Sequence, residues 1–68
     1  FVMAVMKVIE VMASSSKSWE EATRNAVEHA SKSVKHLKSA FVQSQSVVID
    51  DNEISEFRVN VKITFEVK

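Results

Sequence analysis

The sequence contains no cysteine, no proline and no glycine among its 68 residues. Without cysteine, disulfide bonds and thiolate zinc sites are excluded, and a cytoplasmic location is expected. Without glycine, the loops that cradle phosphates in many nucleotide-binding proteins are excluded as well. Turns have to be made by serine, aspartate and asparagine, which can bond their own backbone.

An excess of charge of one sign is also absent. Nine basic and nine acidic residues give a net charge of zero. A protein that binds a nucleic-acid backbone needs a basic excess or a basic patch, so we expect no nucleic-acid partner. The longest apolar stretch, residues 1–6, is too short to span a membrane and lacks the pattern of a secretory signal. We therefore expect no membrane association.

The chain is short for the hydrophobic core that it has to build. In a chain of this size the free energy gained by apolar burial and the cost of lost conformational entropy roughly cancel, and disulfides, a metal or oligomerisation usually supply the missing stability. Disulfides are excluded, and two histidines are too few for most all-imidazole metal sites. We expect residues 1–68 to form one domain that associates with copies of itself.

The hydrophobic pattern predicts a strand followed by a helix. Residues 2–12 are rich in Val, Ile and Met on both faces, which is typical of a strand covered on both sides. A stripe of apolar residues at spacings of three or four predicts a helix over residues 18–37, and Ser18 with Glu21 fits a capping box at its start. The stripe consists of Trp19, Ala22, Ala26, Ala30, Val34 and Leu37. We expect Trp19 to pack the helix onto the sheet.

Two more strands, joined by an acidic turn, complete the predicted fold. Residues 40–49 predict the second strand, and residues 57–68 alternate between apolar and polar without a fault. The predicted class is α+β: a β-α-β-β protomer whose three-stranded antiparallel sheet partly wraps one helix. The other face of the sheet has no cover in a single chain, which again predicts assembly.

Four segments of the sequence together resemble the dodecin family. They are Val5 to Glu10, Ser18-Trp19-Glu20-Glu21-Ala22, Lys35-His36-Leu37-Lys38 and Phe57 to Phe65. The resemblance covers residues 5–67, with the spacing between segments retained. It implies a hollow homododecamer that binds and stores a flavin (FMN, FAD or riboflavin) and is not an enzyme.

Two positions depart from the family pattern for flavin. A tryptophan that stacks on the flavin ring is replaced by Ser39, and a glutamine at the ring edge is replaced by Arg58. Stacking of a base-like ring on an aromatic side chain contributes about 1–3 kcal/mol, so we expect flavin binding to be weakened or lost. We expect any remaining small-molecule pocket to be built by Ser39, Phe41, Phe57 and Arg58 across a symmetry axis. Arg58 would suit an anionic ligand such as a phosphate, or an ion pair with a neighbouring chain.

The acidic turn offers a second candidate site. Asp50, Asp51 and Glu53 supply the hard oxygen ligands that calcium prefers, although their spacing does not match an EF-hand loop. Some dodecin-like proteins that lack the flavin residues are linked to calcium instead. The alternative interpretation is a solvated hairpin turn. A purely structural shell, and a small domain that offers its sheet face to a different protein, are the remaining alternatives.

Overall fold

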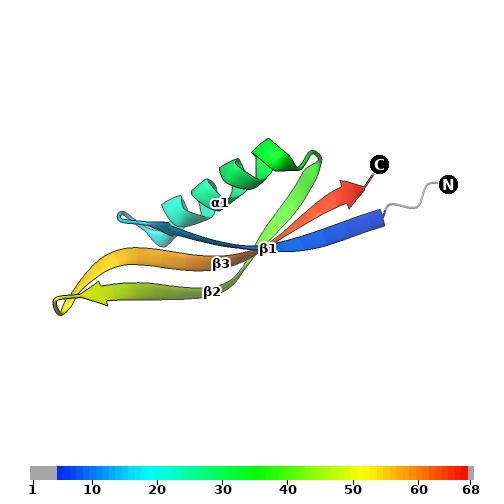
Figure 1. Ribbon diagram of the computed structural model, residues 1–68. Coiled ribbons are helices and arrows are strands. Elements are labelled where there is room, and N and C mark those ends of the chain that lie inside the picture. Colours follow the sequence, from blue (N-terminus) through cyan, green and yellow to red (C-terminus); the bar gives the residue numbers. More distant parts are fainter. Residues whose placement is uncertain (1–4, 68) are drawn as a thin grey trace.

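The structure, a computed structural model, describes residues 5–67 and has the predicted order of elements (Figure 1). They are β1 (Val5–Ser15), α1 (Trp19–Ser33), β2 (Leu37–Asp50) and β3 (Glu53–Val67). The strand order in the sheet is β1-β3-β2, and both pairings are antiparallel. The predicted β-α-β-β order with a three-stranded antiparallel sheet is therefore confirmed. No helix within residues 5–67 is long and apolar enough to cross a membrane.

Alternation along β3 sorts its side chains between the two faces of the sheet. Val59, Val61 and Ile63 lie beneath α1, and each is at most 1% exposed. Asn60 and Lys62, at the intervening positions, belong to the opposite face, as does Arg58 just before Val59. The β1 residues in register with the buried three, which pack against the same core, are Ala13, Val11 and Ile9. The strand with the clearest sequence pattern is thus the central one.

Small residues allow α1 to lie close to the sheet. Ala22, Ala26 and Ala30 are all buried, so the predicted alanine stripe is the packing face of the helix. Ser18 caps the helix, because its Oγ accepts a hydrogen bond of 3.0 Å from the backbone N–H of Glu21. The reciprocal bond from the Glu21 side chain, expected of a full capping box, is absent from the hydrogen bonds of the described residues.

Trp19 fastens the start of α1 to the sheet. Its indole Nε1 donates a hydrogen bond of 3.0 Å to the backbone carbonyl of Ser46 in β2. Its ring meets Phe57 edge to face, with the ring centroids 5.1 Å apart. The side chain therefore contacts both strands of the hairpin, and the predicted packing role is confirmed.

The helix is shorter than its apolar pattern predicts. It ends at Ser33, and Val34 already has extended backbone angles, so the prediction of a helix to residue 37 is wrong. His36 then adopts a φ of 63°, which turns the chain onto the sheet. Leu37 still packs against the core, but it does so from the first position of β2. The spacing of apolar residues could not show that Leu37 lies outside the helix, because the end of α1 and the start of β2 both place a residue against the same part of the core.

The hairpin strands are longer than predicted, and β2 is irregular. Three register shifts interrupt its pairing with β3, which explains why its sequence does not alternate. The two-residue loop between the strands contains Asp51 and Asn52, with φ values of 54° and 62°. Positive φ at both central residues is the signature of a type I′ turn. Residues 2–4 of the predicted first strand and residue 68 of the predicted third strand lie outside the described residues.

The molecule is long and thin, with principal extents of 56 × 20 × 14 Å. Its radius of gyration is 14.2 Å, against about 11 Å for a compact domain of this length. Its accessible surface is 5202 Å², whereas a compact monomer of this mass exposes about 4,300 Å². A single chain therefore leaves surface uncovered that a compact domain would bury.

Candidate functional site

The sheet face opposite α1, which we call the bare face, combines apolar edges with a polar centre. β3 contributes a row of polar residues to the centre, including Arg58 and Lys62. The strands on either side contribute exposed apolar side chains: Met6 is 48% exposed, Val8 58%, Met12 64% and Phe41 66%. Exposed apolar patches of this kind mark interaction surfaces in soluble proteins.

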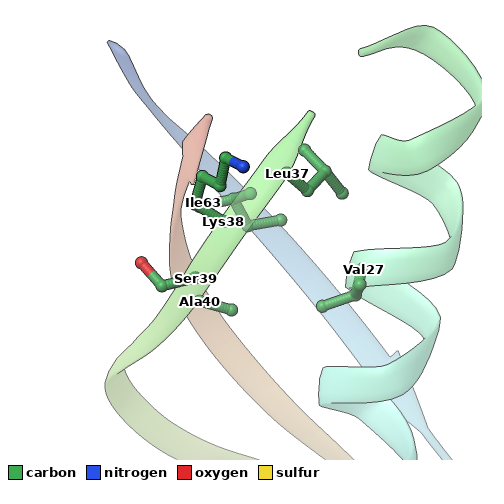
Figure 2. Close-up of a pocket in the computed structure, with 6 residues that line it drawn as sticks. All are labelled: Val27, Leu37, Lys38, Ser39, Ala40 and Ile63. Carbon is green, nitrogen blue, oxygen red and sulfur yellow. The ribbon is translucent and has the colours of Figure 1, made fainter. Parts of the chain in front are cut away.

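Two of the four expected ligand residues lie together on the bare face. Ser39 is in register with Thr64, and Phe41 is in register with Lys62. Figure 2 shows the Ser39 hydroxyl on the side of β2 that faces away from α1. Ser39, at the position where the resemblance leads us to expect a stacking ring, therefore presents a hydroxyl group, and Phe41 is the aromatic residue next to it on that face.

Arg58 shares the bare face but lies further along the sheet. It is in register with Ser46 on β2 and with Ser14 on β1. It is four residues from Lys62 along β3, which corresponds to about 13 Å. Within residues 5–67, no ion pair or hydrogen bond occupies its guanidinium group. This planar group, flanked by two hydroxyl side chains, can hold an anion such as a phosphate.

Phe57 lies on the other side of the sheet, where it packs against Trp19. One chain therefore brings Ser39 and Phe41 together, places Arg58 on the same face at a distance, and directs Phe57 into the contact between helix and sheet. The four residues do not line one pocket within a chain. A site that uses Ser39 and Arg58 together needs a second chain.

The acidic turn forms the far tip of the hairpin. Asp50 and Glu53 are in register with each other, and Asp51 lies in the turn between them. All three are exposed. Among residues 5–67, no group of three or more Asp, Glu or His side chains is close enough to hold a metal ion. Calcium bound at this tip would need further oxygen ligands from water or from another chain.

The sequence pattern did not reveal a pocket between α1 and β2 (Figure 2). Its volume is about 290 Å³. The residues that line it are Val27, Leu37, Lys38, Ser39, Ala40 and Ile63. It exists because α1 covers β1 and β3, while β2 begins beside the end of the helix (Figure 1). Val27 lies off the alanine stripe, and this extra apolar position on the helix was the one signal of the pocket in the sequence.

Comparison with known proteins assigns the chain to a family. The sequence model described as Dodecin matches residues 5–68. The calcium dodecin of Mycobacterium tuberculosis is 32% identical over 66 residues, which are 97% of this chain and 93% of that protein. The crystal structure of that protein, described as calcium-chelating with a novel calcium-binding site, gives a TM-score of 0.83 over 94% of this chain and 91% of the other.

A second structure agrees with the same fold. A dodecin from Streptomyces coelicolor is 28% identical and gives a TM-score of 0.92, covering 96% of this chain and 93% of that chain. The match of the family model extends over nearly the whole sequence, and the order and pairing of the elements agree with it. The chain belongs to the dodecin family.

Proposed function

We propose that this protein is a non-enzymatic, small-ligand-binding homododecamer in which flavin binding is weakened or lost. The bare face carries the proposal: one chain presents Ser39 and Phe41 together there, but its Arg58 lies too far along the sheet to complete a site with them. Copies that cover this face would bury its apolar edges and bring candidate residues of different chains together. A cytoplasmic location remains a prediction from the lack of cysteine.

Assembly is tested by light scattering on the purified chain. Twelve copies of 7.7 kDa give a mass of about 92 kDa, whereas a protein-interaction domain that binds a different chain would give the mass of one or two copies. The visible absorbance of the same peak shows whether flavin accompanies the protein. A folded monomer across a wide range of concentration would contradict the proposal.

The loss of the stacking ring predicts a gain of flavin affinity when that ring is restored. We expect Ser39→Trp to strengthen FMN or riboflavin binding by about 1–3 kcal/mol per ring, because an aromatic surface replaces a hydroxyl on the bare face. Quenching of flavin emission in a titration measures this change.

Ala40→Trp is the matched control for this experiment. Ala40 is adjacent in sequence but lines the pocket on the helix side of β2. The same ring placed there should leave flavin affinity unchanged. Equal gains in the two variants would show that the bare face is not the flavin surface.

Calcium is the second candidate ligand, and a specific observation favours it. A relative with 32% identity over nearly the whole chain is a calcium dodecin, and the hairpin tip offers carboxylates to a cation. We expect calorimetric titration with calcium to show binding that Asp50→Asn/Asp51→Asn weakens at least tenfold. Glu20→Gln, an exposed carboxylate on the first turn of α1, is the control. Equal binding by both variants would place calcium elsewhere, and no binding by the wild type would exclude calcium as a ligand.

A further inference from the structure

The β2–β3 hairpin ends in carboxylates for which residues 5–67 supply no cationic partner. Asp50 and Glu53 lie directly opposite each other, and Asp51 lies between them. Like charges in this arrangement destabilise a strand pair. Behind the carboxylates, Ile49 and Ile54 are also in register, and they are 65% and 56% exposed. We call these five residues the hairpin tip; it combines uncompensated negative charge with an exposed aliphatic pair.

The opposite end of the molecule is basic and contains the pocket. Figure 1 shows the end of α1 and the start of β2 at this end, far from the hairpin tip. Four lysines belong to the segments that meet here: Lys7, Lys32, Lys35 and Lys38. Lys38 pairs with Glu66 at 3.6 Å, while the other three have no ion-pair partner within residues 5–67. We call these lysines and the pocket the basic end.

Two of these lysines, Lys7 and Lys35, lie near the pocket by sequence and by sheet register. Lys35 is two residues before Leu37, which lines the pocket. Lys7 belongs to a row that runs across the sheet through Phe65 to Leu37, a span of about 10 Å. Both lysines are exposed.

We propose that the hairpin tip of one chain docks on the basic end of a second copy. An isoleucine of the tip fills the pocket, and the tip carboxylates face Lys7 and Lys35. This inference rests on the proposed self-association and names a surface for it. The pocket of about 290 Å³ lies at the lower limit of small-molecule sites, which run from about 300 to 1,000 Å³. This pocket would hold about ten water molecules, so it suits a branched aliphatic side chain better than a flavin-sized ligand.

The contact joins two different surfaces, so it is head-to-tail. Contacts of this type generate a closed ring when the rotation between neighbours closes. Each chain then supplies one tip and one basic end, and no tip remains unpaired. The opposite charges also steer the approach of two copies and disfavour wrong pairings.

Charge reversal tests the contact. We expect Asp50→Lys/Glu53→Lys and Lys7→Glu/Lys35→Glu each to raise the dissociation constant of the assembly at least about tenfold at low salt, measured by light scattering across a dilution series. The chain that combines all four substitutions regains the native charge balance. It should return to within about threefold of the wild type. Melting curves of all variants report folding separately, and Asp51 and Asn52 are left unchanged to preserve the turn.

The aliphatic part of the contact has its own test. Ile49→Ala removes a side chain from the tip, and Ala40→Phe narrows the pocket. If both act on one contact, the double variant should dissociate no more readily than the weaker single variant. Additive effects would mean that the two positions do not meet.

The outcomes separate this inference from the proposed function. A wild-type monomer would overturn both. A wild-type assembly that neither charge reversal loosens would overturn the tip contact alone. The tip contact is also overturned if each reversal loosens the assembly and the combined chain does not recover. It is overturned as well if calcium tightens the assembly of Lys7→Glu/Lys35→Glu as it does the wild type, because the tip would then hold a metal in place of lysines.

Discussion

At the scale of single residues, some features of the fold were predictable from the sequence and others were not. The three buried alanines and Trp19 were predictable, because helical spacing and side-chain size directly determine how closely a helix can pack. The positive φ of His36 was not, since glycine is the usual marker of that backbone region and the chain has none. Asp51 and Asn52 occupy the same region, and there the turn chemistry of short polar side chains did give the correct location.

The two-residue turn between β2 and β3 contains no glycine, and introducing one should make the protein more stable. We expect Asp51→Asn/Asn52→Gly to stabilise the protein by about 0.5–1 kcal/mol, because Asn-Gly is the preferred type I′ pair and glycine removes the strain of a left-handed residue. Denaturant unfolding measures the change. Ser55→Gly is the control: Ser55 lies in β3 and its hydroxyl donates to the Val48 carbonyl at 3.1 Å, so glycine there should destabilise. Stabilisation by both variants would mean that the turn geometry is not responsible.

At the scale of elements, the fault-free alternation of β3 predicted the central strand, and the register confirms it. The ends of α1 and β2 were harder to locate. Leu37 continues the helical spacing but belongs to a strand, because a helix end and a strand start can bury a residue in the same core. Strand geometry also separated residues that the sequence pattern had grouped into one candidate site. Phe57 and Arg58 are neighbours in sequence, and a strand sends neighbours to opposite faces.

The start of α1 depends on its cap. We expect Ser18→Ala to lower the free energy of unfolding by about 1 kcal/mol, because the N–H of Glu21 loses its acceptor. Ser18→Asp should retain most of the stability, since a carboxylate at this position accepts the same bond and suits the helix dipole. Ser31→Ala, on the exposed side of the same helix, is the control and should be nearly neutral. An equal loss in the control variant would show that the effect of Ser18→Ala does not come from the cap, because alanine is the better helix former and cannot lower stability through helix propensity.

At the scale of the whole molecule, the core of one chain is too small for the surface that it exposes. Within residues 5–67, half of the six buried apolar residues are alanine, and eight large apolar side chains are exposed. This imbalance was predictable from chain length and from the missing disulfides. The arrangement of neighbouring chains was not predictable, because the symmetry of an assembly depends on which surfaces of the chains fit together and not on the periodicity of one chain.

Stability should therefore depend on protein concentration. Because association stabilises only the folded chain, we expect the unfolding temperature to rise as the protein is concentrated and to fall on dilution. Differential scanning calorimetry over a hundredfold range of concentration measures this shift. A cooperative transition at the same temperature throughout would mean that the single chain is stable without its copies.

The position of Trp19 has a practical consequence. The sequence contains one indole ring, and that ring bridges the start of α1 and the two hairpin strands within a single chain. Its ultraviolet emission therefore reports whether the helix is seated on its own sheet, while scattering reports how many subunits have come together. Watching both signals after rapid dilution would order the two events in time, without any dye or added label.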